Sequence, residues 1–200
     1  MNGKSRSASC GSLTAKFGSK NLTGSYCMNT SSRHCIQLTP SEMMQAGLVG
    51  LMRGVGSIKA GKKHRFGVDP VDSWSIQIEG AMGEMAAAKV MRRYWSGTVN
   101  TYDHDDLDGI EVRTAFKHSH SLILHPTDPD DLPFVLVTGM NGEYKVQGFI
   151  LAKNGKQQQF WRDPCGGRPA FFVPQSALQN IEEIHEYRTH CPDAGPEKIW

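Results

Sequence analysis

The sequence predicts one α/β (α+β) domain in which a mixed β-sheet is flanked by helices. Two stretches with helical periodicity come before residue 96 and a third follows residue 175, with strand-like segments between them. Helices before and after a compact run of strands are typical of a sheet with helices packed on it. The length of 200 residues and the apolar share of 38% suit one domain with appendages.

The predicted domain covers residues 36–190. Residues 1–35 are rich in Ser, Gly, Thr, Asn and Lys, so we expect a disordered, basic N-terminal extension, and residues 191–200 are expected to form a C-terminal tail. The N-terminus lacks the apolar segment of a secretory signal, and no run approaches 18 apolar residues. Five scattered cysteines indicate free thiols in a reducing compartment. We therefore expect a cytoplasmic protein without a membrane span.

Two helices are predicted in the first half of this domain. The segment "TPSE" at residues 39–42 matches a capping box with proline at the first helical position, and the helix is expected to continue to residue 58. A second helix is expected at residues 76–95, where three consecutive alanines favour helix strongly. Gly97 lies where a stop is expected.

After Gly97 the periodicity changes to that of strands. Turns rich in Asp, Pro, Gly and Asn separate the predicted strands, which should assemble into one main mixed sheet. A closing helix is expected at residues 176–187. The predicted strands are residues 98–103, 110–116, 121–125, 134–139, 144–152 and 169–174.

Charge is distributed unevenly along the chain. Residues 1–65 carry ten Lys and Arg against one acid, whereas residues 66–145 carry six against thirteen. A basic arm beside an acidic centre fits a protein that binds a polyanion and has a metal site. A basic tail that only aids solubility is an equally good interpretation. The candidate phosphate-binding cations in "KAGKKHR" are Lys59, Lys62, Lys63 and Arg65.

The segment "DHDDLDGIEVRT" at residues 103–114 contains five acids within nine residues. Asp108-Gly109 is a preferred pair for a two-residue hairpin loop. Counting outward from that loop, Leu107 faces Ile110 and Asp106 faces Glu111. Cross-strand Cβ atoms are about 5 Å apart, so the carboxylates of Asp106 and Glu111 are predicted to lie close together.

Two neighbouring carboxylates repel each other unless a cation lies between them or one takes a proton. Oxygen ligands of this kind suit Mg²⁺ or Mn²⁺. Strand periodicity places Arg113 on the face of Glu111, where its guanidinium could bind a phosphate. An exposed hairpin whose acids are solvated, with Arg113 merely neutralising them, explains the same spacing.

These residues resemble the PD-(D/E)XK nuclease superfamily, which has the restriction-endonuclease-like fold. Asp105-Asp106 corresponds to the Pro-Asp of its motif, and "EVR" at residues 111–113 corresponds to acid-x-Lys, with arginine in place of lysine. "GAMGEMAAAKVM" resembles the first-helix signature, with Glu84 as the helix glutamate. The resemblance covers about residues 38–175 and extends to a phage-encoded, uncharacterised group of this superfamily.

The resemblance implies a Mg²⁺-dependent (or Mn²⁺-dependent) endonuclease that hydrolyses phosphodiester bonds, with DNA as the expected substrate and a homodimer as a possible assembly. Glu84, Asp106 and Glu111 would bind the metal together with the backbone carbonyl of Val112. Arginine is not a base at neutral pH, so Arg113 would position phosphate. Glu79 is a rival or a supplement to Glu84, although five residues on a helix turn about 500° and put the two on different faces.

Other patterns are weaker. His118, His120 and His125 could suggest a metal cluster, but no cysteine pattern supports zinc. "DPDD" at residues 128–131 is expected to be a loop, with calcium binding as the alternative. The alternative to the nuclease is a catalytically weak protein of the same fold that binds nucleic acid or a host protein.

Overall fold

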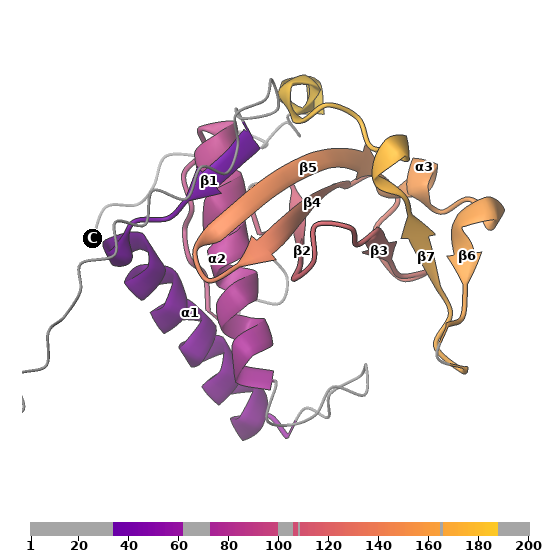
Figure 1. Cartoon of the computed structure of the whole chain (residues 1–200). Helices are drawn as coiled ribbons and strands as arrows, with labels where there is room; N and C mark the ends of the chain where they lie inside the picture. Colours follow the sequence, from indigo (N-terminus) through magenta and orange to yellow (C-terminus); the bar gives the residue numbers. More distant parts are fainter. Residues whose placement is uncertain (1–33, 62–72, 100–105, 108, 165, 188–200) are drawn as a thin grey trace, which may run out of the picture.

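The structure is a computed structural model of the chain, and it describes residues 34–61, 73–99, 106–107, 109–164 and 166–187. The expected α+β architecture is confirmed, because a mixed sheet is flanked by two long helices, of which α2 lies on the sheet and α1 packs on α2 (Figure 1). In these ranges no helix combines the length and the apolar character that a bilayer span requires. Lys62, Lys63, Arg65 and most of the expected strand 98–103 lie outside them.

The main sheet has four strands in the order β1-β5-β4-β2. Strand β2 runs parallel to β4, whereas β4–β5 and β5–β1 are antiparallel, so the sheet is mixed. Strand β1 begins at the last residue of the expected N-terminal extension and pairs with Lys145. The bounds are β1 Cys35–Gln37, β2 Glu111–Ala115, β4 Pro133–Met140 and β5 Glu143–Leu151.

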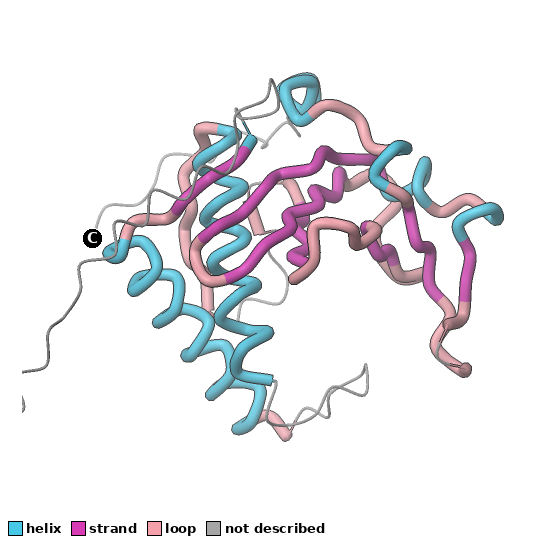
Figure 2. The backbone as a smooth tube through the Cα atoms, in the orientation of Figure 1, coloured by secondary structure: helices cyan, strands magenta, loops and turns pink. Residues whose placement is uncertain are grey.

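A second, antiparallel sheet accounts for the remaining strands and was not expected. Its order is β3-β7-β6, and Figure 2 shows it beyond the end of the main sheet that is distant from α1. The short helix α3 (Ala152–Gly155) follows β5 directly. The bounds are β3 Leu122–Leu124, β6 Trp161–Arg162 and β7 Ala170–Val173.

Helix α1 (Pro40–Lys59) begins as predicted. The Thr39 hydroxyl accepts the N–H of Glu42, and the Glu42 carboxylate accepts the N–H of Thr39. Its glycines serve packing: a Cβ at Gly50 would lie 2.5 Å from Ile78 Cα, so only glycine allows α1 to cross α2 this closely. The small residues of α1 therefore face α2.

Helix α2 (Ser73–Met91) ends four residues before the predicted end at residue 95. The reason is a left-handed Arg92 with φ of 53°. The N–H groups of Arg92 and Arg93 bond back to the carbonyls of Lys89 and Ala88, which is the hydrogen-bond pattern of a Schellman motif. The helix is thus closed before Gly97 is reached.

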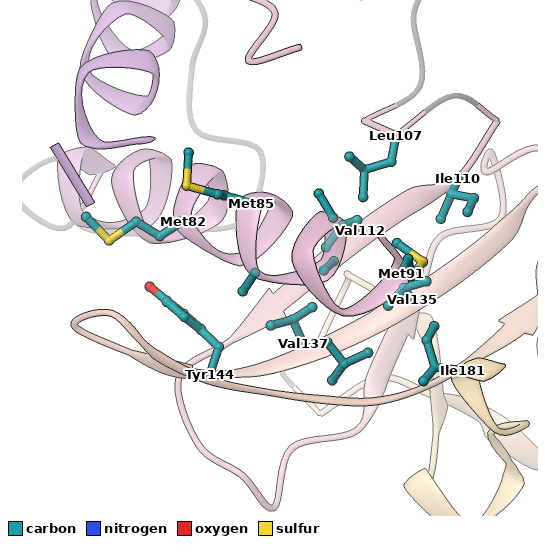
Figure 3. Packing of buried hydrophobic residues seen from close by; sticks show 14 of the residues in the cluster. Met82, Met85, Met91, Leu107, Ile110, Val112, Val135, Val137, Tyr144 and Ile181 are labelled. Carbon is teal, nitrogen blue, oxygen red and sulfur yellow. The ribbon is translucent and has the colours of Figure 1, made fainter. Parts of the chain in front are cut away.

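The two faces of the main sheet are buried against different partners. Val135 and Val137 of β4 point toward α2, where they join Met85, Met91 and Val112 (Figure 3). Alternate residues of the same strand, beginning with Phe134, point toward β3 and β7. Strand β4 is therefore the shared wall of both hydrophobic clusters.

The predicted closing helix at residues 176–187 is wrong. The segment forms two 3₁₀ helices, η3 (Gln175–Ala177) and η4 (Ile181–Tyr187), and a further 3₁₀ turn, η2, covers Gln158–Phe160. Gln179 exchanges both backbone hydrogen bonds with Phe149, at 2.8 and 3.1 Å. An extended residue paired with β5 cannot continue an α-helix, so the segment divides there.

Candidate functional site

The site is built where α2 contacts β2. A Cβ at Gly83 would lie 2.0 Å from Thr114 Oγ1, so the absence of a side chain at Gly83 lets the helix approach the strand. A Cβ at Gly80, one turn earlier, would meet nothing within 4 Å. Of the two glycines in the motif, Gly83 has the structural role, and it brings the next residue, Glu84, beside β2.

Glu84 is buried, with 5% of its surface exposed, and both of its carboxylate oxygens accept hydrogen bonds. Arg53 of α1 donates from Nη1 to Oε1 and from Nη2 to Oε2, the second bond at 2.9 Å. Trp95 Nε1 donates to Oε2 at 3.1 Å. The guanidinium is fixed in turn by Thr98, whose carbonyl accepts Nε at 2.9 Å. An internal cation therefore already compensates the predicted helix glutamate.

The side chain of Asp106, five residues before Glu111, contacts the backbone of β2. Its Oδ2 accepts the backbone N–H of Val112 at 2.9 Å. Burial, followed by the negative charges of Glu84 and Glu111, raises the pKa of Asp106 to about 7, although the Val112 hydrogen bond and Arg53 act in the opposite direction. Glu84 and Glu111 are thus each close enough to Asp106 to act on its carboxylate electrostatically.

The turn before β2 brings Leu107 opposite Ile110, as the sequence predicts. Leu107 donates its N–H to the Ile110 carbonyl at 3.1 Å, and both side chains are buried near the end of α2 that bears Met91 (Figure 3). Gly109 has a φ of 79°, which favours glycine. Most of the strand expected at residues 98–103 lies outside the described residues, and the described partner of β2 is the parallel strand β4.

Glu111 and Arg113 share one face of β2, as strand periodicity predicts. Arg113 Nη1 lies 3.6 Å from Glu111 Oε2, and Nη2 lies 3.2 Å from Asp128 Oδ1. The guanidinium carbon lies 5.0 Å from the centre of the Phe134 ring, within cation–π range. Asp128 also accepts the N–H of His125 at 2.8 Å. Arg113 is therefore held in place between two carboxylates and an aromatic ring.

The fit to a divalent ion rests on Asp106 and Glu111. Among the described residues no three His, Cys, Asp or Glu side chains are arranged to bind a metal, and the oxygens of Glu84 are taken by Arg53 and Trp95. Mg²⁺ often uses only one or two protein carboxylates and keeps several waters. Two mutually repelling acids fit that chemistry, while Val112 contributes an N–H to Asp106 and its carbonyl role stays a prediction.

Glu79 serves a different purpose from Glu84, on another side of α2. Its carboxylate accepts the hydroxyl of Tyr144 and the backbone N–H of Asn141, the latter at 3.2 Å. Burial, together with Glu79, raises the pKa of the Tyr144 hydroxyl. Glu79 therefore fixes the β4–β5 turn and does not reach the acid cluster. Of the two glutamates, Glu84 is the one whose charge acts on Asp106, and its role as a metal ligand stays a prediction.

Three weaker candidates also have structural roles. His118 Nδ1 lies 3.0 Å from Thr138 Oγ1. The ammonium of Lys156 contacts the carbonyls of Pro126 and Asp128 and lies 2.7 Å from Asp130 Oδ1, so a lysine side chain occupies the loop for which calcium binding is the alternative prediction. Lys59, the described member of the basic segment, lies in the last turn of α1.

Sequence reasoning missed Arg53, Trp95 and Asp128. Arg53 had a detectable signal, because it is the single charged residue of α1 between Glu42 and Lys59. Asp128 had none, since its distance from Arg113 in sequence hides the contact. Comparison of the chain with protein-family models, with curated proteins and with solved structures finds no match.

Proposed function

We propose that the protein is a Mg²⁺-dependent or Mn²⁺-dependent nuclease that hydrolyses phosphodiester bonds, with DNA as the expected substrate. The observation that carries this proposal is the position of Asp106, buried against Val112 and within electrostatic reach of Glu84 and Glu111. Like charges brought together in a buried position mark a place where a cation is bound more favourably than in water. The resemblance to PD-(D/E)XK nucleases supports the same chemistry.

Each residue has a separate role in this proposal. Asp106 and Glu111 would bind the metal, which when bound polarises a phosphodiester and lowers the pKa of water. Arg113, oriented by Asp128 and Phe134, would donate hydrogen bonds to a phosphate oxygen. Glu84 would add negative charge near the ligands while Arg53 fixes its orientation. The resemblance also makes a phage origin, the host cytoplasm and a homodimer the expected setting.

A plasmid-nicking assay in Mg²⁺ or Mn²⁺ tests the proposal. Wild type should nick the plasmid, and Asp106→Ala and Glu111→Ala should reduce the rate at least about 100-fold. Asp131→Ala is the matched control, because its side chain is 93% exposed and its ion-pair partner is Lys153 of α3. Equal nicking by all four proteins would mean a contaminating nuclease and would overturn the proposal.

A catalytically weak protein of the same fold, binding nucleic acid or a host protein, is the second candidate. The bidentate pair of Arg53 and Glu84 favours it, because part of the acidic charge is already compensated without a metal. In that case DNA binding without cleavage, falling steeply with salt concentration, is expected. The absence of both DNA binding and cleavage would favour the host protein as partner.

A further inference from the structure

A cavity of about 930 Å³ opens beside β2, on the side of Arg113. It lies between the edge of the main sheet, the second sheet and the loop that leads into β7. Its volume is at the upper end of the range for small-ligand pockets, which are about 300–1,000 Å³. Neither sheet alone forms this cavity, so the packing of the two sheets creates it.

One wall of the cavity is apolar and accessible. Ile123 of β3 and Phe172 of β7 are direct cross-strand partners, and both line the cavity. Ile76 at the start of α2 faces them from the opposite element. Ile123 and Ile76 are 39% and 38% exposed, a high value for large aliphatic side chains in a concave surface. A flat, partly apolar group would bury this wall.

The other wall carries cations. Arg113 and Arg168 both line the cavity, against one carboxylate, that of Asp128. Arg168 is positioned by Asp163, whose carboxylate accepts the backbone N–H groups of Gly167 and Arg168 at 2.6 and 3.1 Å. Arg113 Nε is buried and has no acceptor among the residues that the structure describes. The cavity therefore combines apolar surface with donors suited to a phosphate.

Arg113 connects the cavity with the acid pair. It lines the cavity and also lies 3.6 Å from the carboxylate of Glu111. A phosphate next to Arg113 would thus be near Glu111, whose charge also acts on Asp106, while the nucleotide beside it would point into the cavity. A nucleotide bound in the cavity would therefore place the adjacent phosphodiester beside Arg113.

We propose that this cavity binds an unpaired nucleotide, with its base against Ile123 and Phe172 and its phosphate on Arg168. This inference rests on the proposed function and specifies its substrate: single strands, or duplexes with unpaired ends or flaps, are preferred to intact duplex. Bases inside a duplex are covered by their neighbours, so they reach an apolar wall only after unstacking, which costs a few kcal/mol. An unpaired base reaches it without that cost and stacks on an aromatic ring.

Binding without cleavage tests the cavity separately from catalysis. Fluorescence anisotropy in EDTA compares a labelled 12-nucleotide oligo(dT) with a blunt duplex of the same length. We expect wild type to bind the single strand at least about 10-fold more tightly, and Phe172→Ala and Arg168→Ala to weaken that binding about 5- to 30-fold. Arg162→Ala, an exposed arginine of β6 outside the cavity lining, is the matched control and should stay within about two-fold of wild type.

The melting temperature of each variant is measured to check that it folds. If Phe172→Ala does not fold, Ile123→Asp is tested in its place. Equal or tighter binding of duplex, or unchanged affinity in the cavity variants, would overturn the inference. Single-strand binding through the cavity, without cleavage of that oligonucleotide in either Mg²⁺ or Mn²⁺, would support it and overturn the nuclease. Equal cleavage of duplex and single strand, with no effect of the cavity variants, would support the nuclease and overturn the inference.

Discussion

Arg53 of α1 and Glu84 of α2 form a two-bonded ion pair whose side chains are 19% and 7% exposed. The pair joins the two long helices directly behind the acid cluster. A buried pair gains little net stability over apolar residues of similar size, but loss of one partner leaves an uncompensated charge. Its two halves should therefore be strongly coupled.

The first prediction concerns that coupling. Arg53→Met should lower the free energy of unfolding by about 3–5 kcal/mol, because it leaves Glu84 charged and buried. The double variant Arg53→Met/Glu84→Gln should recover a large part of the loss, as measured by urea denaturation in a double-mutant cycle. Lys89→Met, which removes the more exposed pair of Lys89 with Glu42, is the control and should cost less than about 1 kcal/mol. Additive effects of Arg53 and Glu84 would contradict this interpretation.

The second prediction concerns the pH dependence of stability. The pKa of Asp106 is raised from 3.8 to about 7, so the folded state binds a proton more tightly than the unfolded state does. The contribution of Asp106 is fully present below about pH 4 and is lost as the pH rises through 7. Asp106→Asn keeps an acceptor for the Val112 N–H and does not titrate. Its free energy of unfolding relative to wild type should therefore increase by roughly 2–4 kcal/mol from pH 4 to pH 8.

Urea titrations at pH 4, 6 and 8 measure this difference. A constant difference between Asp106→Asn and wild type across the three values would show that the Asp106 carboxyl titrates normally.

The third prediction concerns the helix–strand contact. Gly83→Ala should destabilise the fold by about 1–3 kcal/mol, because its Cβ would overlap Thr114 Oγ1. Thr114→Ala in the same chain should restore part of the loss. Gly80→Ala is the control, since a Cβ there meets nothing within 4 Å, and it should stabilise the helix by about 0.5–1 kcal/mol. Equal effects of the two alanines would contradict the packing assigned to Gly83.

The fourth prediction concerns metal binding without reference to activity. Mn²⁺ at about 100 times its dissociation constant should stabilise wild type by about 2.7 kcal/mol, read as a rise in melting temperature that EDTA reverses. Asp106→Asn and Glu111→Gln should lose that rise. Asp131→Asn should keep it, because this exposed aspartate lies in another loop. The same rise in all four proteins would place the bound metal elsewhere.

Local signals gave the reliable sequence predictions. The start of α1 at Pro40 depends on residues 39–42 alone, and the strands β3, β4, β5 and β7 follow from runs of β-branched and aromatic residues between turns. The pairing of Glu111 with Arg113 also follows from a period of two. Structural features that depend on residues close together in the sequence can therefore be predicted from the sequence.

Features determined by distant partners were not predictable. The contact of Arg53 with Glu84 spans 31 residues, and that of Arg113 with Asp128 spans 15 residues that include β3. The prediction of a closing α-helix was wrong because Phe149 pairs with Gln179, thirty residues away. The early end of α2 is different, because a left-handed arginine is uncommon and the sequence gives no warning of it.

The parallel pairing of β2 with β4 has a consequence for the order of folding. The β4–β5 hairpin turns at Asn141-Gly142, both at positive φ, and needs only local contacts. The β2–β4 ladder joins residues such as Glu111 and Phe134, so a longer loop must close before it forms. Stopped-flow refolding of point variants gives the kinetic φ-value, the ratio of the change in folding activation free energy to the change in stability. We expect this ratio to be near 1 for substitutions in the hairpin and near 0 for substitutions at Val112. The strand that bears Glu111 and Arg113 would then be the last to dock, and the acids would meet only in the finished protein.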